Sequence, residues 1–561
     1  MRKRREAYKG LEAYFQPTLA DTAAERARQW RRYATRRQEA VREPLLKLSS
    51  DDPRAVCLED VFVPLRAWHP APPQEKSGQE GATAKAEVWE RASDRERPVF
   101  VDLRKHIDEW LTKADATDAI RVISGEPGCG KSSFALMWAA AQARAGRRVL
   151  YVPLHMLSFN RDAFEAVQAF AADDTQLGCD PFGGLADGAP VILILDGLDE
   201  LSRVSETGGE VARTFVTSLS QNLYQKNYGK DNARVLALLV GRPLAIHEGA
   251  AALKKLGQRV EILRLRVQAA EFPNTKKEDL PEDRRDQWWR NYFRATGQPD
   301  TGMPGEYQAG GTRMDEITAQ PLLNYLLALV RDERTKKGQP TAIDCVHTLY
   351  GEVFELLYQR KKGQLAHRGA VEDRFELSDY KRFLEEVAIA AWHSGGDRAV
   401  RSDAIQHRIA TCDQRLQNQL RHDYESLEHG LFAVLSTFFV APEAGTFGHY
   451  TFTHKSFREY LTAARIVREV EEIDDQRRNA KRYPPEQALS DWYALTSSVP
   501  IDLDLRTFLV EEVEARAGGG SSVGAWRDTL KGLFEANLRD GMPGYKDAPT
   551  FREAERRAAN A

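Results

Sequence analysis

The chain lacks the features of a membrane protein and of a disulfide-stabilised secreted protein. No apolar run approaches the roughly 18–20 residues that are needed to cross a bilayer, and the longest, such as VILIL, have the length of short strands. The five cysteines are scattered and odd in number, and none forms a CxxC pair. This pattern argues against a disulfide framework and against a zinc site. We therefore expect a cytoplasmic protein without membrane contact.

An excess of charge of one sign is also missing. The formal net charge is -3, so the chain as a whole has no general attraction for nucleic acid or acidic membranes. Residues 1–50 are the exception, with 13 Lys and Arg against 6 Asp and Glu. We interpret this basic arm as a solvated or packing helix, because no nucleic-acid recognition motif accompanies it. Contact with nucleic acid through the arm is the alternative.

Short apolar strands alternate with helices from about residue 98. The runs AIRVIS, RRVLYVPL, VILILD, RVLALLV and RVEILRL predict buried strands. This alternation indicates a parallel sheet with helices on both faces. After about residue 270 helices dominate, except for a β-hairpin predicted within TFFVAPEAGTFGHYTFTH. The predicted fold is an α/β core followed by helical domains, mostly α overall.

The segment GEPGCGKSS, residues 125–133, matches the phosphate-binding pattern G-x-x-x-x-G-K-[ST]. It follows a predicted strand and opens a predicted helix, which is the structural context of such a loop. Gly125, Gly128 and Gly130 let the backbone curl so that its N–H groups converge on phosphate oxygens. The start of the helix adds a partial positive charge.

Side chains of the same segment suit the charged end of a nucleotide. Lys131 is placed to reach the β- and γ-phosphates, and the Ser132 hydroxyl is placed to ligate Mg²⁺, with Ser133 beside it. The sequence therefore predicts binding of ATP or ADP together with Mg²⁺.

Three acidic residues end or follow the predicted strand VILILD. A carboxylate at the end of such a strand holds Mg²⁺, as in a Walker B motif, and we assign Asp196 to this role. Glu200, assisted by Asp199, is assigned to polarising the attacking water. The alternative is a helix N-terminus whose dipole favours acids. Arg242 follows the strand RVLALLV and is assigned either to the γ-phosphate or to a structural ion pair.

Together these motifs resemble, in order and spacing, the NACHT branch of the STAND signal-transducing P-loop NTPases. The resemblance covers about residues 98–470 and includes DGLDEL after the acidic strand, LLVGRP at the sensor-1 position, ITAQPLLNYLLALV and FTHKSFREYLTAARI. It implies that Pro321, in a helical domain, packs near the adenine. It also implies that His454, in a winged-helix domain, contacts the β-phosphate of ADP and locks a closed state.

Composition, together with the resemblance over about residues 98–470, sets the expected order of domains. We expect a basic helical arm with a short strand at 1–66, a flexible linker at 67–97, a NACHT P-loop core at 98–265, a helical domain at 266–340, a winged-helix domain at 341–475 and a C-terminal helical segment at 476–561.

The implied function is a nucleotide-gated switch in bacterial anti-phage defence. ADP holds the closed state, ATP with Mg²⁺ opens the chain for homo-oligomerisation, and hydrolysis is slow. The trigger is an unidentified ligand such as a phage or host protein. Because the segment after residue 476 contains no repeats, we expect the sensor to lie beyond residue 561.

Other interpretations stay open. His454 is equally explained as a surface histidine, because Ser456 and Glu459 form an S-x-x-E capping box and an apolar face begins at Phe457. A AAA+-type remodelling ATPase is a second class, although no arginine finger or aromatic pore loop stands out in the sequence. A nucleic-acid-associated winged-helix protein is a third class. Its helix, HKSFREYLTAARIVREVEE, carries mixed charges.

Overall fold

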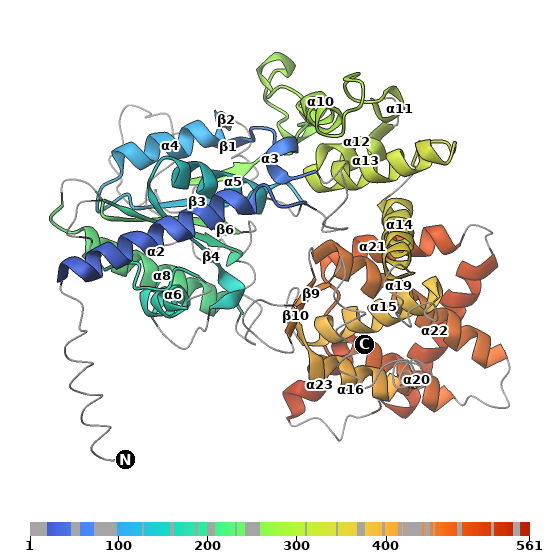
Figure 1. Ribbon diagram of the computed structural model, residues 1–561. Helices are drawn as coiled ribbons and strands as arrows, with labels where there is room; N and C mark the ends of the chain where they lie inside the picture. Colours follow the sequence, from blue (N-terminus) through green and yellow to red (C-terminus); the bar gives the residue numbers. More distant parts are fainter. Residues whose placement is uncertain are drawn as a thin grey trace, which may run out of the picture. The chain divides into compact units, whose positions relative to one another are not determined.

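The chain forms two compact units in the computed structural model (Figure 1). The first comprises Met1–Leu45, Pro53–Pro304 and Ala319–Leu322, and the second comprises Leu46–Asp52, Gly305–Thr318 and Leu323–Ala561. The structure describes residues 19–45, 56–71, 98–125, 128–157, 162–173, 176–183, 185, 189–198, 208–230, 233–241, 258–308, 311–343, 346–366, 376–394, 399–412, 418, 440–442, 449–452, 455–478, 485–517, 521–541, 543 and 550–561.

A seven-stranded, mostly parallel sheet forms the centre of the first unit, with the strand order β2-β1-β7-β3-β6-β5-β4. The five strands that the sequence predicts are all present and pair in parallel. They are β3 (Ile120–Ser124), β4 (Arg148–Pro153), β5 (Val191–Asp196), β6 (Val235–Gly241) and β7 (Arg259–Ile262).

Two antiparallel strands extend the sheet beyond β7. They are β1 (Arg66–Pro70), which pairs with β7, and β2 (Pro98–Asp102), which pairs with β1. Strand β2 is not predicted from the sequence, because this run leads directly into a helix whose first turn is capped by the Asp102 carboxylate. The predicted linker of 67–97 overlaps β1 at its start, and residues 72–97 lie outside the described residues.

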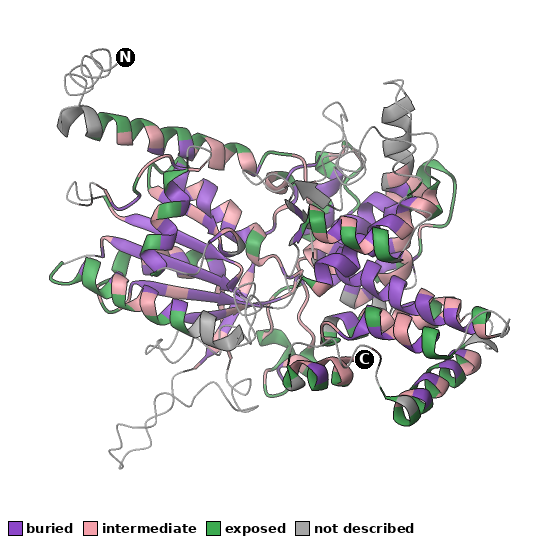
Figure 2. Cartoon of the chain, turned by 90° about the horizontal axis from the view of Figure 1, so that it is seen from below, coloured by how far each residue is buried: buried purple, intermediate pink, exposed green. Residues whose placement is uncertain are grey.

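The central strands are buried on both faces. Every residue of β5 and β6 is buried, which Figure 2 shows as continuous purple strands. Such uninterrupted apolar strands are expected where helices cover both faces of a parallel sheet. The helices of this unit are α2 (Leu19–Ala40), α3 (Leu58–Val61), α4 (Leu103–Lys113), α5 (Lys131–Arg144), α6 (Ala163–Ala172), α8 (Gly208–Asn227) and α10 (Arg285–Ala295).

The second unit is mainly helical. A three-stranded antiparallel sheet in the order β8-β10-β9 accompanies the helices. The hairpin predicted from sequence is present as β9 (Val440–Pro442) and β10 (His449–Phe452), whereas β8 (Ala399–Arg401) was not predicted. No helix in the described part of the chain is long and apolar enough to span a membrane.

The helices after α10 carry most of the second unit. They are α11 (Gly305–Gln308), α12 (Gly311–Ala319), α13 (Pro321–Lys336), α14 (Val346–Ala366), α15 (Leu377–His393), α16 (Ser402–Cys412), α19 (Lys455–Arg478), α20 (Pro485–Thr496), α21 (Leu503–Arg516), α22 (Ser521–Asp540) and α23 (Phe551–Asn560). Among them α15, α19 and α21 pack against one another and bury an apolar cluster that includes Ile389, Ala463 and Leu505.

Charged side chains are buried between α15, α16 and α19. Glu386, which is 2% exposed, accepts hydrogen bonds from Nε of Arg465 at 2.6 Å and from Nε of Arg408 at 2.8 Å. Arg465 also pairs with Glu469 at 2.6 Å. Burial alone would raise the pKa of Glu386, but the two guanidinium groups outweigh this effect and lower the pKa to about 2.

Replacing Glu386 with Gln should destabilise the second unit. We expect the free energy of unfolding at pH 7 to fall by roughly 3 kcal/mol, because Arg408 and Arg465 lose the buried carboxylate to which both donate, and Arg465 keeps its pair with Glu469. The folded-state pKa of about 2 lies below the value of about 4.3 in an unfolded chain. The contribution of Glu386 is therefore complete above the unfolded-state pKa and is lost as the pH falls toward 2.

Urea unfolding of the parent and of Glu386→Gln between pH 7 and pH 3 measures this contribution, and the difference should shrink in the acid range. Asp403→Asn is the matched control. It breaks an exposed ion pair between Asp403 of α16 and Arg401 of β8. It should leave the unfolding midpoint unchanged. If both substitutions lowered the free energy of unfolding equally, the burial of Glu386 would not explain its contribution to stability.

Candidate phosphate-binding site

The predicted phosphate-binding loop connects the end of β3, at Ser124, to the start of α5, at Lys131. Gly130 is the N-cap residue of α5 and has φ of 97°, and Gly128 has φ of 74°. Both values lie in the left-handed region, where a glycine carries no steric penalty. The turn therefore brings the N-terminus of α5 to the carboxyl end of β3, and helix N-termini attract anions.

The start of α13 lies against this loop. A Cβ atom on Gly128 would lie 2.6 Å from Oε1 of Gln320, and one on Gly130 would lie 3.1 Å from Cδ1 of Leu65 and 3.7 Å from Cγ of Pro321. Gln320 and Pro321 belong to the first unit. The structure thus brings Pro321 to the glycine loop, and it adds Gln320 and Leu65, which the sequence analysis did not single out.

Lys131 folds back onto the loop that precedes it. Its Nζ donates a hydrogen bond to the carbonyl oxygen of Gly125 at 2.6 Å and lies 3.9 Å from Sγ of Cys129. Cys129 is buried. Ser132 is exposed and Ser133 is half-buried in the first turn of α5.

The ends of neighbouring parallel strands meet at the same edge of the sheet. Ser124 at the end of β3 pairs with Gly241 at the end of β6, and Asp196 at the end of β5 pairs with Val240 of β6. Asp196 is buried, and its Oδ2 accepts a hydrogen bond from the hydroxyl of Tyr151 at 2.6 Å. Asp196 therefore lies on the edge that carries the glycine loop.

The strand order reverses at this loop. After β3 the chain crosses in one direction, past β6 and β5, to form β4 at the end of the sheet. After β6 it crosses in the opposite direction, past β3, to form β7. In open α/β sheets, ligands bind at the carboxyl ends of two adjacent strands whose connections diverge in this way. Here β3 and β6 form that pair, so topology and the glycine loop indicate the same location.

Four predicted site residues, Asp199, Glu200, Arg242 and His454, lie outside the described residues. Arg242 follows β6 in the sequence, and β6 pairs directly with β3. The assignment of Arg242 to the γ-phosphate requires these two strands to be neighbours.

The helix that follows His454 in the sequence differs from the capping-box expectation. This helix, α19, begins at Lys455, so Ser456 lies inside the first turn instead of at the cap. The Ser456 hydroxyl accepts a hydrogen bond from the hydroxyl of Tyr350 at 2.5 Å. The apolar face that begins at Phe457 is buried, as predicted.

The available donors fit a magnesium ion that is bound together with a nucleotide. In the described part of the chain no group of three or more His, Cys, Asp or Glu side chains could hold a metal ion on its own. Magnesium in nucleotide sites takes one or two protein oxygens and completes its coordination shell with phosphate and water. The hydroxyl of Ser132 and the carboxylate of Asp196 are oxygen donors of this kind.

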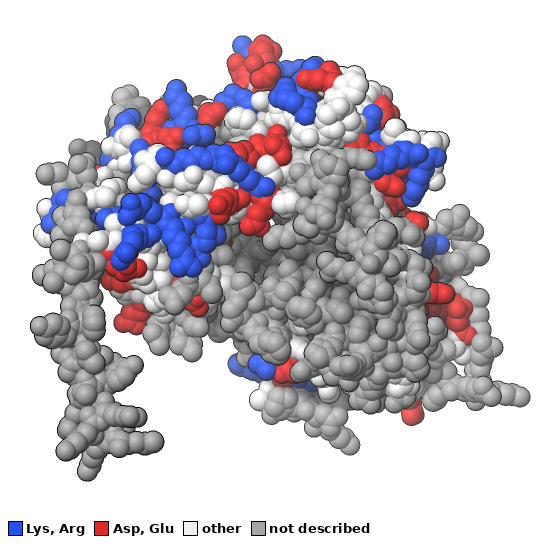
Figure 3. Space-filling view, viewed as in Figure 1, with Lys and Arg blue, Asp and Glu red and all other residues white. Residues whose placement is uncertain are grey.

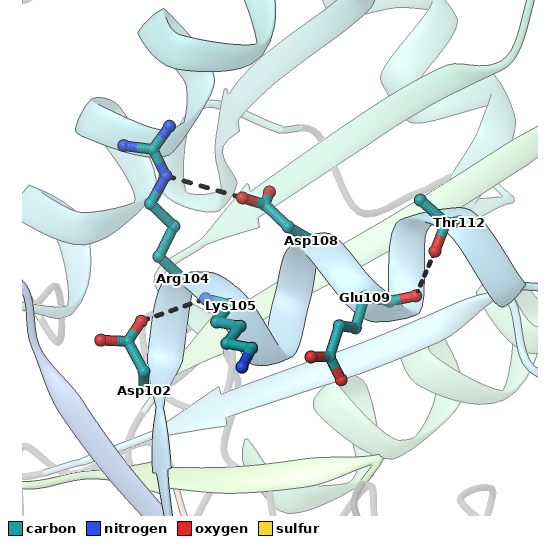
Figure 4. A pocket seen from close by; sticks show the side chains of 6 residues that line it. All are labelled: Asp102, Arg104, Lys105, Asp108, Glu109 and Thr112. Carbon is teal, nitrogen blue, oxygen red and sulfur yellow. Dashed lines mark hydrogen bonds and ion pairs between the residues drawn. The ribbon is translucent and has the colours of Figure 1, made fainter.

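A shallow surface pocket follows the outer face of α4 and does not involve the loop residues (Figure 4). Its charged groups have partners close by: Arg104 lies 3.6 Å from Asp108, and the Asp102 carboxylate accepts from the main chain of Lys105 at 3.1 Å and lies 3.5 Å from Arg66 of β1. Asp108 also accepts hydrogen bonds from α5, through the Trp138 indole at 2.8 Å. We therefore interpret this pocket as the outer side of a structural contact with α5.

The basic arm predicted from sequence packs on the sheet through one face. Trp30 and Tyr33 of α2 are buried, and α2 contacts α5 and β4. Arg28, Arg31 and Arg32 are exposed, and Figure 3 shows Lys and Arg side chains gathered in the region of this helix. The buried face supports the interpretation of the arm as a packing helix, and contact with nucleic acid through the exposed face stays a prediction.

No protein-family model matches the chain, and no curated protein matches it. The class of the protein is therefore argued from the motifs and from the α/β fold.

Replacing Lys131 with Ala should weaken the binding of ATP and of ADP by roughly 100-fold, because a charge-assisted contact to phosphate is lost. Titration with a fluorescent ATP analogue measures the change. Lys113→Ala, at the exposed end of α4, is the control and should bind as the parent does. Equal binding by the Lys131 variant and the parent would contradict the assignment of the loop.

Proposed function

We propose that the protein is a P-loop NTPase that acts as a nucleotide-gated switch. ADP favours a closed state, and ATP with Mg²⁺ favours an open state that self-associates. The observation that carries the proposal is the glycine loop between β3 and α5, which holds Lys131 at the point where the strand order reverses. The presence of Asp196 on the same edge of the sheet supports it further.

Each residue has a distinct role in this proposal. The loop N–H groups and the N-terminus of α5 bind the phosphates, and Lys131 neutralises charge on the β- and γ-phosphates. Ser132 and Asp196 hold Mg²⁺, which when bound offsets the charge that develops during phosphoryl transfer. Glu200, assisted by Asp199, orients the attacking water.

Gating requires that the nucleotide bias a two-state element. Pro321 lies against the loop at the start of α13, and the chain passes from the first unit to the second within this helix, between Leu322 and Leu323. A shift at the nucleotide would thus act on a continuous element of secondary structure. We assign His454 to the β-phosphate of ADP and Arg242 to detection of the γ-phosphate. The biological setting, bacterial anti-phage defence, follows from the resemblance to NACHT proteins.

The nucleotide that is released when freshly purified protein is denatured tests the switch. We expect about one ADP per chain from the parent and much less from His454→Ala, because loss of the phosphate contact loosens ADP. His407→Ala, at an exposed position of α16, is the control and should retain ADP. An empty parent that turns over ATP at about 1 per second or faster would indicate a working ATPase instead of a switch.

Replacing Glu200 with Gln should separate binding from hydrolysis. The amide keeps the size of the side chain but removes the base that polarises water, so we expect unchanged ATP affinity and a rate reduced by roughly 100-fold or more. Phosphate release in a single turnover measures the rate, and size-exclusion chromatography with ATP shows whether the variant accumulates in an associated form. Normal hydrolysis by this variant would refute the role of Glu200.

A further inference from the structure

A hydroxyl group fixes the orientation of the acidic residue at the end of β5. The terminal torsion of an aspartate is broad, so its rotamer alone does not aim the carboxylate. Tyr151 of β4 donates to Oδ2 of Asp196 at 2.6 Å. In the strand register Tyr151 lies opposite Ile194, two residues before Asp196, so the phenol extends along the sheet toward the carboxyl edge.

The main chain of Tyr151 is in turn held by α2. The hydroxyl of Tyr33 accepts a hydrogen bond from the N–H of Tyr151 at 3.1 Å and donates one to its carbonyl oxygen at 3.2 Å. Among the described residues β4 is the last strand of the sheet, so these groups of Tyr151 point to the side on which no other described strand pairs. The Tyr33 hydroxyl thus pairs with both the N–H and the C=O group of Tyr151, which an additional strand would otherwise pair with.

Tyr33 is itself held firmly. Its side chain is 1% exposed, its ring makes an edge contact with Trp30 at a centroid distance of 6.3 Å, and the guanidinium carbon of Arg37 lies 5.2 Å from the ring centroid. Burial raises the pKa of Tyr33, against the opposing effect of Arg37. The hydroxyl therefore keeps its proton at neutral pH and serves as donor and acceptor at once.

We propose that Tyr151 is a positioning residue for the magnesium-binding carboxylate of Asp196, and that α2 supports the metal site through Tyr33. This inference rests on the proposed nucleotide site. It assigns to the N-terminal helix a role in metal–nucleotide binding that its basic composition does not suggest. By linkage, binding of magnesium and nucleotide also strengthens the docking of α2.

Magnesium titration at a fixed concentration of a fluorescent ATP analogue tests the proposal. Tyr151→Phe keeps the ring and removes only the hydroxyl. We expect the magnesium concentration at half-maximal binding to rise about 10-fold or more, as for other groups that orient metal ligands. The affinity for the same nucleotide in EDTA should stay unchanged, because the loop and Lys131 are intact. Tyr33→Phe should shift the magnesium requirement in the same direction by a smaller factor.

Tyr224→Phe, on α8 and 47% exposed, is the matched control and should titrate as the parent does. A thermal melt of each variant verifies that the fold is retained. An unchanged magnesium requirement in Tyr151→Phe would overturn the positioning role. A loss of affinity that is equal with magnesium and in EDTA would reduce Tyr151 to a structural residue and would also overturn it.

Failure of the proposed function and failure of this inference give different results. If the parent binds no nucleotide with or without magnesium, the proposed function fails and the inference fails with it. If the parent binds with magnesium and Tyr151→Phe matches it, only the inference fails. If Tyr151→Phe shifts and Tyr33→Phe does not, Tyr151 keeps its role and the part assigned to α2 is wrong.

Discussion

The main-chain register between β3, β6 and β5 is the constraint on which the candidate site depends. Ser124 of β3 pairs with Gly241 of β6, and Asp196 of β5 pairs with Val240 of β6. The glycine loop after β3 and the carboxylate at the end of β5 therefore lie at the same edge of the sheet. A slip of one residue would turn the side chain of Asp196 to the other face. The buried, apolar strands prevent such a slip, since every residue of β5 and β6 is packed on its face.

The two units rest on different interactions. In the first unit every residue of the central strands β5 and β6 is buried. The second unit buries several ionised groups between its helices, among them Glu386, Arg408 and Arg465. The contribution of Glu386 to the stability of this unit is lost only in strong acid, as the pH falls from the unfolded-state pKa toward about 2.

Sequence patterns predict local structure well and contacts across the sheet poorly. The five parallel strands are short runs rich in apolar residues, and each is found where the pattern places it. Strand β2 leads directly into α4, and β8 has only three residues. Tyr151 and Gln320 were missed because their partners, Asp196 and Gly128, lie far away in the chain. The buried charges of α15 and α19 appear in the sequence as ordinary polar helix positions. Only the packing of these helices shows that they face one another.

The contact between Tyr33 and the edge of β4 also bears on the solubility of the chain. A sheet whose last strand presents unpaired N–H and C=O groups can add strands from other molecules and so begin to aggregate. Here one phenol from α2 occupies these groups at Tyr151, midway along the strand. The helix thus protects the sheet from growth at this edge. A proteolytic cut that removes α2 would expose this edge to strand-to-strand association.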